Sequence, residues 1–321
     1  MLKLAVATLC ALLAAVPGAT AQTYPSKPIR FVAPFPPGGS ADTIARLLAQ
    51  ELGKSLGQQV LVENRPGAGG NIGVDLVAKS PPDGYTIGIG AAGALAINQS
   101  LMGKLPYDPL KDLAAVSKLA DIPIVLAAAN STPAASVGDL IAAAKAKPGV
   151  LSFASAGNGT AMHLSGELFK LMTGVDMAHI PYKGSGPATT DLVAGQVPVG
   201  FVDLSSALPQ IRAGRIKGLG VASGKRTLTA PDIPTIAESG VPGYDAVGWF
   251  GVVAPARTPG DVIARLNAEI VRIMALPEVR ERALAVGAEP STSTPEAFAA
   301  FIAAEIPKWE RVVRASGARA N

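Results

Sequence analysis

The sequence predicts an α/β fold of two lobes, because short apolar strands alternate with amphipathic helices in two successive series. The first series fills the first third of the chain, and the second begins at Ile122. Such alternation favours mixed, mostly parallel sheets, whose ligands bind in the crevice at the carboxyl ends of the strands. The chain of 321 residues, 49% of them hydrophobic, is long enough for about two domains.

The first 21 residues predict a secretory signal peptide. Lys3 is followed by an apolar run over residues 4–16 and by the small residues Ala19-Thr20-Ala21. We expect cleavage after Ala21 and a periplasmic mature protein, because the run is shorter than the roughly 18 residues that a membrane span needs. Cys10, the only cysteine, lies inside this run, so the mature chain has no thiol.

Strands are predicted where short apolar runs are bounded by Gly, Pro or Asn, and helices where apolar residues recur every three or four positions, as at Ile44, Leu47 and Leu48. In chain order, we expect strands at residues 29–33, 60–63, 85–90, 124–128, 150–154, 177–180, 199–203, 217–222 and 249–254. We expect helices at residues 42–56, 72–79, 137–146, 162–172, 187–194, 206–213, 259–276 and 295–315.

The charge pattern argues against a nucleic-acid partner. The net charge of +4 is small and spread along the chain, and no basic stripe is interleaved with aromatic residues. The sequence also lacks a long apolar surface stripe that a second copy of the chain would cover, so we expect a monomer.

A glycine-rich turn after the first strand opens the first helix and indicates an anion site. Gly38 and Gly39 let the backbone approach a ligand closely. The first N–H groups of the helix have no intrahelical partner and carry the positive end of its dipole, so they suit a carboxylate or phosphate. The alternative is an ordinary strand-to-helix connection with Ser40 as its N-cap.

Three more glycine-rich turns follow strands, at residues 64–73, 155–160 and 181–187, and another strand ends at Asp203. The first of these turns resembles a dinucleotide fingerprint, but Ile72 stands where the third glycine is required. No acidic residue follows at the expected distance, where Ile87 stands. We therefore expect no nucleotide or other cofactor.

Catalytic and metal-binding residues are scarce. The two histidines, His163 and His179, lie at a helix start and at a strand end, where structural roles are expected. No serine lies in a Gly-x-Ser-x-Gly elbow between an expected strand and an expected helix, and metal ligands do not cluster. The alternative that remains open is a secreted α/β enzyme acting on a small carboxylate or ester through Ser155 or Ser185.

Several motifs occur in order along essentially the whole mature chain. They are Pro34-Phe35-Pro36-Pro37-Gly38-Gly39-Ser40-Ala41-Asp42, Asn64-Arg65-Pro66-Gly67-Ala68-Gly69-Gly70-Asn71, Pro82-Asp83-Gly84-Tyr85-Thr86, Gly157-Asn158-Gly159-Thr160, Pro181-Tyr182-Lys183-Gly184, Pro231-Asp232-Ile233-Pro234-Thr235 and Gly240-Val241-Pro242-Gly243-Tyr244.

These motifs resemble those of the Bug (Bordetella uptake gene) proteins, the extracytoplasmic solute receptors of tripartite tricarboxylate transporters. The resemblance implies a two-lobed, type II-like periplasmic binding fold without catalysis that presents a small carboxylated solute to a membrane permease. Dicarboxylates, amino acids and aromatic acids all remain open as solutes, as does a second use of the site in a sensor for a membrane kinase. We expect the first lobe at 22–123 and 247–321, the second at 124–246, and the C-terminal helices packed on the first.

The resemblance also implies a site in which backbone and bridging water hold the carboxylate, with no arginine. Asp203 would orient the bridging water. The residues implied on the first lobe are Phe35, Gly38, Gly39, Ser40, Gly69 and Gly70, and those facing them from the second lobe are Ser155, Asn158, Gly159, Thr160, Gly184 and Ser185.

Overall fold

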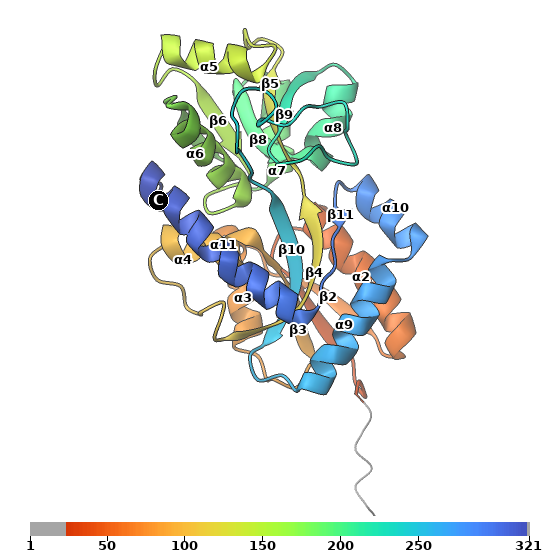
Figure 1. Ribbon diagram of the computed structural model, residues 1–321. Helices are drawn as coiled ribbons and strands as arrows, with labels where there is room; N and C mark the ends of the chain where they lie inside the picture. The colour runs from red at the N-terminus through yellow and green to blue at the C-terminus, as the bar shows by residue number, and fades with distance from the viewer. Residues whose placement is uncertain (1–23, 320–321) are drawn as a thin grey trace, which may run out of the picture.

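The computed structural model describes residues 24–319, which form two mixed sheets with helices on both faces of each (Figure 1). The predicted cleavage site and Cys10 lie outside the described residues. The strands are β1 (Ile29–Ala33), β2 (Val60–Asn64), β3 (Thr86–Ala91), β4 (Leu113–Ile122), β5 (Ile124–Ala129), β6 (Ser152–Ser155), β7 (Ala178–Pro181), β8 (Val199–Asp203), β9 (Ile216–Val221), β10 (Gly248–Pro255) and β11 (Glu289–Pro290).

The helices include a short 3-10 turn, η1, and a π-helix, η2. They are α2 (Ser40–Leu56), η1 (Ala68–Gly70), α3 (Asn71–Ala78), η2 (Gly93–Ile97), α4 (Asn98–Leu101), α5 (Val137–Ala146), α6 (Ala161–Thr173), α7 (Ser185–Val193), α8 (Leu204–Arg212), α9 (Gly260–Met274), α10 (Pro277–Ala285) and α11 (Pro295–Ser316).

The first sheet has the strand order β11-β4-β10-β3-β1-β2, and the second has the order β7-β6-β8-β5-β9. In the first sheet β1 pairs in parallel with β2 and β3, while β10 runs antiparallel between β3 and β4. In the second, β6 pairs in parallel with β7 and β8, while β5 runs antiparallel between β8 and β9. The chain passes from the first sheet to the second at Pro123 and returns before Gly248.

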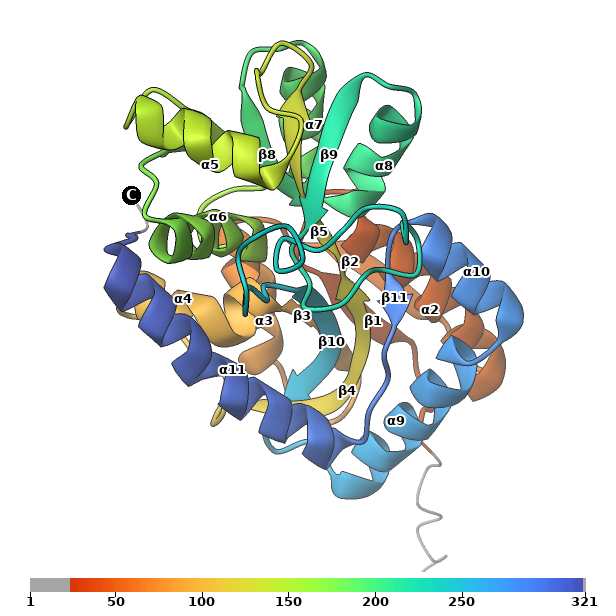
Figure 2. The same ribbon diagram turned by 45° about the horizontal axis from the view of Figure 1, so that its top comes forward.

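Helices cover both faces of each sheet, as Figure 2 shows from a second direction. In the first sheet α2 and α9 bury one face, and α3, η2 and α11 bury the other. In the second sheet α7 and α8 cover one face and α6 the other. The C-terminal helices therefore pack on the first sheet, as expected, but α11 also contacts α6 of the second. The two-lobed α/β fold with mixed sheets is confirmed. The expectation that the sheets are mostly parallel is wrong, because β4, β5 and β10, which adjoin the crossings between the sheets, pair antiparallel with their neighbours.

Every predicted strand and helix is present within a few residues of its expected bounds, but β4, η2 and α10 were not predicted, and neither were the short elements η1, α4 and β11. Strand β4 alternates poorly between apolar and polar residues, because its pairing with β10 is interrupted by two shifts of register. Segment η2 consists of small apolar residues that are all buried and shows no helical period. Helix α10 buries only Val279 and Ala283, so its apolar face is too narrow to stand out. No helix among residues 24–319 is both apolar enough and long enough to span a membrane.

Candidate functional site

Parallel strands carry their carboxyl ends to one edge of each sheet, and the predicted turns follow at those edges. In the first sheet β1, β2 and β3 end at Ala33, Asn64 and Ala91. In the second, β6 and β8 end at Ser155 and Asp203. The turns meet across the lobes, because a β-carbon at Gly69 would lie 3.1 Å from the Asn158 carbonyl oxygen. The candidate site is therefore bounded by both sheets.

The first turn is held by a buried carboxylate. Asp42 Oδ2 accepts the Gly38 N–H at 3.0 Å, and Asn64 Nδ2 donates to Asp42 Oδ1 at 2.8 Å and to the Phe35 carbonyl at 3.0 Å. Burial raises the pKa of Asp42, but hydrogen bonds from Arg46, Gly38 and Asn64 outweigh it and lower the pKa below its ordinary value. The nearby Arg46 guanidinium is thus committed to Asp42.

The helix that opens after this turn is not capped by Ser40. Gly39 occupies the N-cap position with φ −81° and ψ 172°, Ser40 is the first helical residue, and no side chain caps the helix. The Gly38 N–H is used within the turn, so only the backbone beyond it is left to meet an anion. Gly38 and Gly39 are exposed, whereas Phe35 and Ser40 are half-buried.

The second turn has an unusual run of left-handed backbone. Gly67, Ala68, Gly69 and Gly70 all have positive φ, at 131°, 48°, 64° and 100°. L-residues rarely adopt such angles, which explains the density of glycine here. A β-carbon at Gly70 would lie 3.5 Å from the ring of Phe35, so the first and second turns pack together.

In the second lobe, the hydroxyls of the third turn are used internally. Ser155 Oγ lies 2.6 Å from His179 Nε2 and accepts the Gly157 N–H at 3.1 Å. Thr160 Oγ1 donates to the Gly157 carbonyl at 2.7 Å and, as the N-cap of α6, accepts the His163 N–H at 3.4 Å. Ser155 and Thr160 therefore shape this turn, and backbone groups and Asn158 are left to face a solute.

The two histidines support the third turn from behind. His163 Nδ1 accepts the Gly159 N–H at 3.3 Å, and the His163 ring stacks on His179 with centroids 4.0 Å apart. His179 also stacks on Phe153 at 4.9 Å. Burial, with a smaller effect of Lys170, lowers the pKa of His163 to about 4. Burial and the neighbouring His163 lower the pKa of His179 to about 3, so both rings are neutral near pH 7.

Ser155 and His179 lie as close as a nucleophile and its base. However, Ser155 is completely buried, and a histidine with a pKa of about 3 is a weak base at neutral pH. Within residues 24–319, no carboxylate hydrogen-bonds to either histidine. Ser185, the other candidate nucleophile, accepts the Asp203 N–H at 3.1 Å instead of contacting a histidine. The geometry does not favour either serine as a nucleophile.

The fourth turn and Asp203 complete the second lobe's side. The Gly184 N–H donates to the Ala156 carbonyl at 3.1 Å, which ties the fourth turn to the third. Asp203 stands at the N-cap position of α8, but its side chain makes no capping hydrogen bond. Its Oδ1 is buried and has no partner among the described residues. Burial, partly offset by the hydrogen bond with Ser185, raises the pKa of Asp203 to about 6.

Asn98 is a contact residue that the sequence did not predict. It is fully buried at the start of α4, and its Nδ2 donates to Asn71 Oδ1 at 2.8 Å. A β-carbon at Gly159 would lie 2.2 Å from Asn98 Oδ1, so the amide faces the third turn across the lobes. The signal in the sequence that could have indicated Asn98 is its position as a single polar residue directly after the apolar run 94–97.

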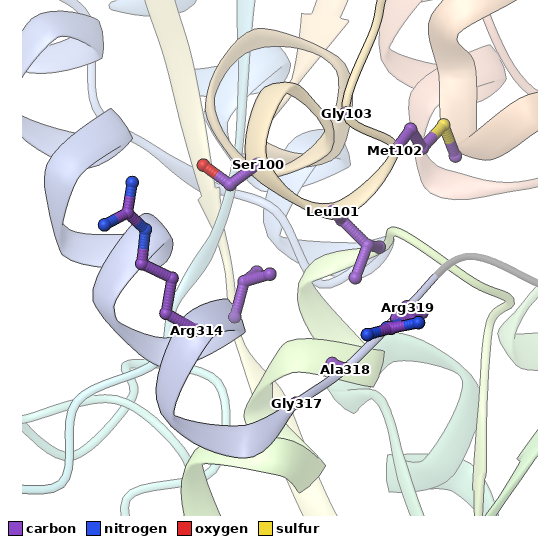
Figure 3. A pocket seen from close by; sticks show the side chains of 9 residues that line it. Ser100, Leu101, Met102, Gly103, Arg314, Gly317, Ala318 and Arg319 are labelled. Carbon is purple, nitrogen blue, oxygen red and sulfur yellow. The ribbon is translucent and has the colours of Figure 1, made fainter.

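Two cavities lie away from these turns and contain none of the predicted site residues. One, of about 460 Å³, lies between α4 and the end of α11 and is lined by Leu101, Met102, Arg314 and Arg319 (Figure 3). The other, of about 210 Å³, lies between α8 and α10. In the part of the chain that the structure describes, no three potential metal ligands cluster.

Comparison with known proteins identifies close relatives. Residues 44–318 match the family described as the tripartite tricarboxylate transporter family receptor. The protein BugT of Bordetella pertussis is 44% identical over 301 residues, which cover 94% of this chain and 92% of BugT.

Three solved structures are similar over most of the chain. R. palustris Rpa4515 with adipate has a TM-score of 0.86 at 38% identity, covering 92% of this chain and 98% of that one. The periplasmic binding protein BugD has a TM-score of 0.84 at 35% identity, covering 92% and 99%. MatC from Rhodopseudomonas palustris with bound malate has a TM-score of 0.83 at 34% identity, covering 90% and 100%.

Proposed function

Since the chain belongs to the tripartite tricarboxylate transporter receptor family, we propose that it is a periplasmic receptor that closes on a small carboxylated solute and delivers it to a membrane transporter. The observation that carries the proposal is the contact of Gly69 in the first lobe with the Asn158 turn in the second. Glycine-rich turns at the carboxyl ends of both sheets are thereby close enough to bind one solute between them.

The proposed site binds the carboxylate without a cationic side chain. Arg46, the guanidinium beside the first turn, is paired with Asp42. Main-chain donors and a bridging water bind an anion without burying a cation, whose desolvation is costly. A micromolar affinity, which lets a receptor release its solute, needs only about 8 kcal/mol. The unpartnered Oδ1 of Asp203 is where a bridging water would donate.

The proposal retains the thirteen residues expected from the sequence and the expected lobes. Ser155, Thr160 and Ser185 would contribute through the turns that their hydroxyls shape. The first lobe comprises 22–123 and 247–321, and the second comprises 124–246. In support, the chain crosses between the sheets at Pro123 and before Gly248. The proposed solute-binding residues are Phe35, Gly38, Gly39, Ser40, Gly69, Gly70, Ser155, Asn158, Gly159, Thr160, Gly184, Ser185 and Asp203.

Among solute classes, we put dicarboxylates first. Two relatives of similar structure are described with adipate and with malate, which are both dicarboxylic acids. Glycine-rich turns on both lobes offer a backbone anion site to each end of such a molecule. Amino acids and aromatic monocarboxylates are the competing classes.

A thermal-shift screen with adipate, malate, an amino acid and an aromatic acid tests the function. A ligand at 100 times its Kd stabilises the folded state by about 2.7 kcal/mol, so the melting temperature rises measurably. Dimethyl adipate, which lacks the charges, is the matched control and should give no shift. NMR of the recovered adipate should show it unchanged, whereas turnover would favour the secreted enzyme. No shift with any carboxylate would contradict the receptor.

Export is part of the proposal. Relatives that are periplasmic binding proteins support a periplasmic location, and the sequence predicts removal of residues 1–21. The intact mass of the exported protein should correspond to a chain that begins at Gln22, and light scattering should give a monomer. Retention of residues 1–21 would contradict the processing step, and a stable dimer would contradict the expected monomer.

A further inference from the structure

Three glycines from separate segments meet where the two lobes touch. Gly93 is the first residue of η2, Gly69 lies in the second turn, and Gly159 lies in the third turn on the other lobe. A β-carbon at Gly93 would lie 2.4 Å from the Gly159 carbonyl oxygen and 3.1 Å from the Gly69 carbonyl oxygen. Both neighbours are backbone atoms, so neither can rotate aside as a side chain would.

Gly93 differs from the other two glycines in its backbone. Gly69 and Gly159 have φ of 64° and 74°, where any side chain is strained. Gly93 has no such angle and lies in a helical segment, so alanine suits its conformation. Within the first lobe, a methyl group at Gly93 needs only a small shift of Gly69. The severe overlap is with Gly159 of the second lobe.

We propose that Gly93 sets how closely the two lobes approach, and that it thereby positions the binding groups without touching the solute. The inference rests on the proposed function. A carbon 2.4 Å from an oxygen is about 1 Å short of van der Waals contact, so a methyl group would force the lobes apart by a similar amount. Hydrogen bonds of about 2.9 Å do not survive that displacement, and a solute would keep contacts with one lobe only.

A second close contact lies on the opposite flank of the site, where α8 and α10 approach each other (Figure 2). A β-carbon at Gly287, just after α10, would lie 2.5 Å from Cβ of Ser205 in α8. Gly287 has φ +70°, so its substitution would also strain the backbone, and Gly93 is the cleaner probe. With close contacts on both flanks, the spacing of the lobes is fixed on either side of the turns.

The test compares the wild type with Gly93→Ala and with the control Gly260→Ala. Gly260 opens α9, has no left-handed φ, and has no atom within 4 Å of a β-carbon. Circular dichroism and melting temperature establish that both variants fold. Calorimetric titration with adipate and with malate should show affinity reduced roughly tenfold or more in Gly93→Ala, as expected for the loss of one or two hydrogen bonds, and unchanged in Gly260→Ala. Small-angle scattering should show a larger radius of gyration for Gly93→Ala than for the wild type under the same conditions.

Each remaining outcome decides between the two proposals. A folded Gly93→Ala protein that binds as tightly and is as compact as the wild type overturns the inference and leaves the receptor function intact. A Gly93→Ala protein that fails to fold also overturns it, because the first lobe must accommodate the methyl group. If the wild type binds neither adipate, malate nor any other carboxylate of the screen, the proposed function fails. Scattering without added solute then decides the inference alone, and equal radii for the two proteins contradict it.

Discussion

At the scale of single residues, the buried carboxylate at the end of β8 is the group whose replacement separates binding from stability. Asp203→Asn keeps the shape but weakens the acceptor that would orient a bridging water. We expect solute affinity to fall roughly ten- to a hundredfold, as for the loss of a charge-assisted hydrogen bond of about 1.5–3 kcal/mol. Calorimetric titration measures this change. Asp176→Asn, which alters an exposed carboxylate of the same lobe, should leave affinity unchanged.

Asp203→Asn should lower solute affinity but raise the stability of the folded protein at neutral pH. Burial raises the folded-state pKa of Asp203 to about 6, above its ordinary value of 3.8. The folded protein therefore holds a proton between these values, and the contribution of Asp203 to stability is lost as pH rises through about 6. The melting temperature of Asp203→Asn minus that of the wild type should therefore be larger at pH 7 than at pH 4. A melting temperature that falls at pH 7, with affinity unchanged, would instead make Asp203 a structural group.

The stacked histidines predict a loss of stability in mild acid. Burial lowers the folded-state pKa values of His163 and His179 to about 4 and about 3, from an ordinary value of 6.5. Between pH 6.5 and about 4 the unfolded chain binds protons that the folded one does not. Stability then falls by about 1.4 kcal/mol per pH unit for each histidine. Urea denaturation at several pH values should show this dependence of the free energy of unfolding on pH. In His163→Asn, which retains an acceptor for the Gly159 N–H, the slope should be smaller by the share of one histidine. An unchanged slope would contradict a lowered pKa for His163.

Glycine, serine and aspartate at strand ends made the turns predictable, because backbone angles and strand polarity are local properties of the sequence. Hydrogen-bond partners were less predictable. The use of the Gly38 N–H by Asp42 could be expected from their spacing of four, but Asn98 facing Gly159 depends on two lobes docking. The histidines were expected to be structural, and His163 hydrogen-bonds to the third turn, but their stacking on each other was not foreseen.

At the scale of elements, the close packing of α11 against β10 depends on Gly251. A β-carbon at Gly251 would lie 2.1 Å from the ring of Phe298, which is completely buried. We expect Gly251→Ala to lower the free energy of unfolding by about 1–3 kcal/mol through overpacking. Chemical denaturation measures the change. Adding Phe298→Leu should restore part of the loss, because the smaller side chain leaves room for the methyl group. Gly260→Ala is the control, and equal stability of all variants would contradict this packing.

The elements that the sequence predicted share a strong period or a clear boundary. Helix α9 has apolar residues on one face from Val262 to Ile273, and α11 begins at an N-cap threonine followed by proline. In contrast, β4 and η2 are stabilised by their neighbours. Strand β4 lies between β10 and β11, and η2 lies under α11, so tertiary contacts decide both.

At the scale of the whole molecule, the two lobes could be predicted from the two series of strands and helices, but the apolar core that joins them could not. One buried cluster includes Val32 of β1 and Leu95 of η2 in the first lobe, Phe153 of β6 and Leu164 of α6 in the second, and Trp309 of α11. It forms because α11 contacts β4 and η2 and extends to α6. Nothing in the period of α11 indicates that its last turns reach the other lobe.

A shared core predicts that the protein unfolds as one unit. The first lobe is built from two separate stretches of chain, and its buried cluster continues into the second lobe, so neither lobe exposes its core without disrupting the other. Differential scanning calorimetry should therefore show a single transition with equal calorimetric and van't Hoff enthalpies. Saturating adipate, if bound, should move that whole transition upward, because it stabilises only the native state. Two resolved peaks, or a shift confined to part of the transition, would show that the lobes unfold independently and that α11 does not couple them.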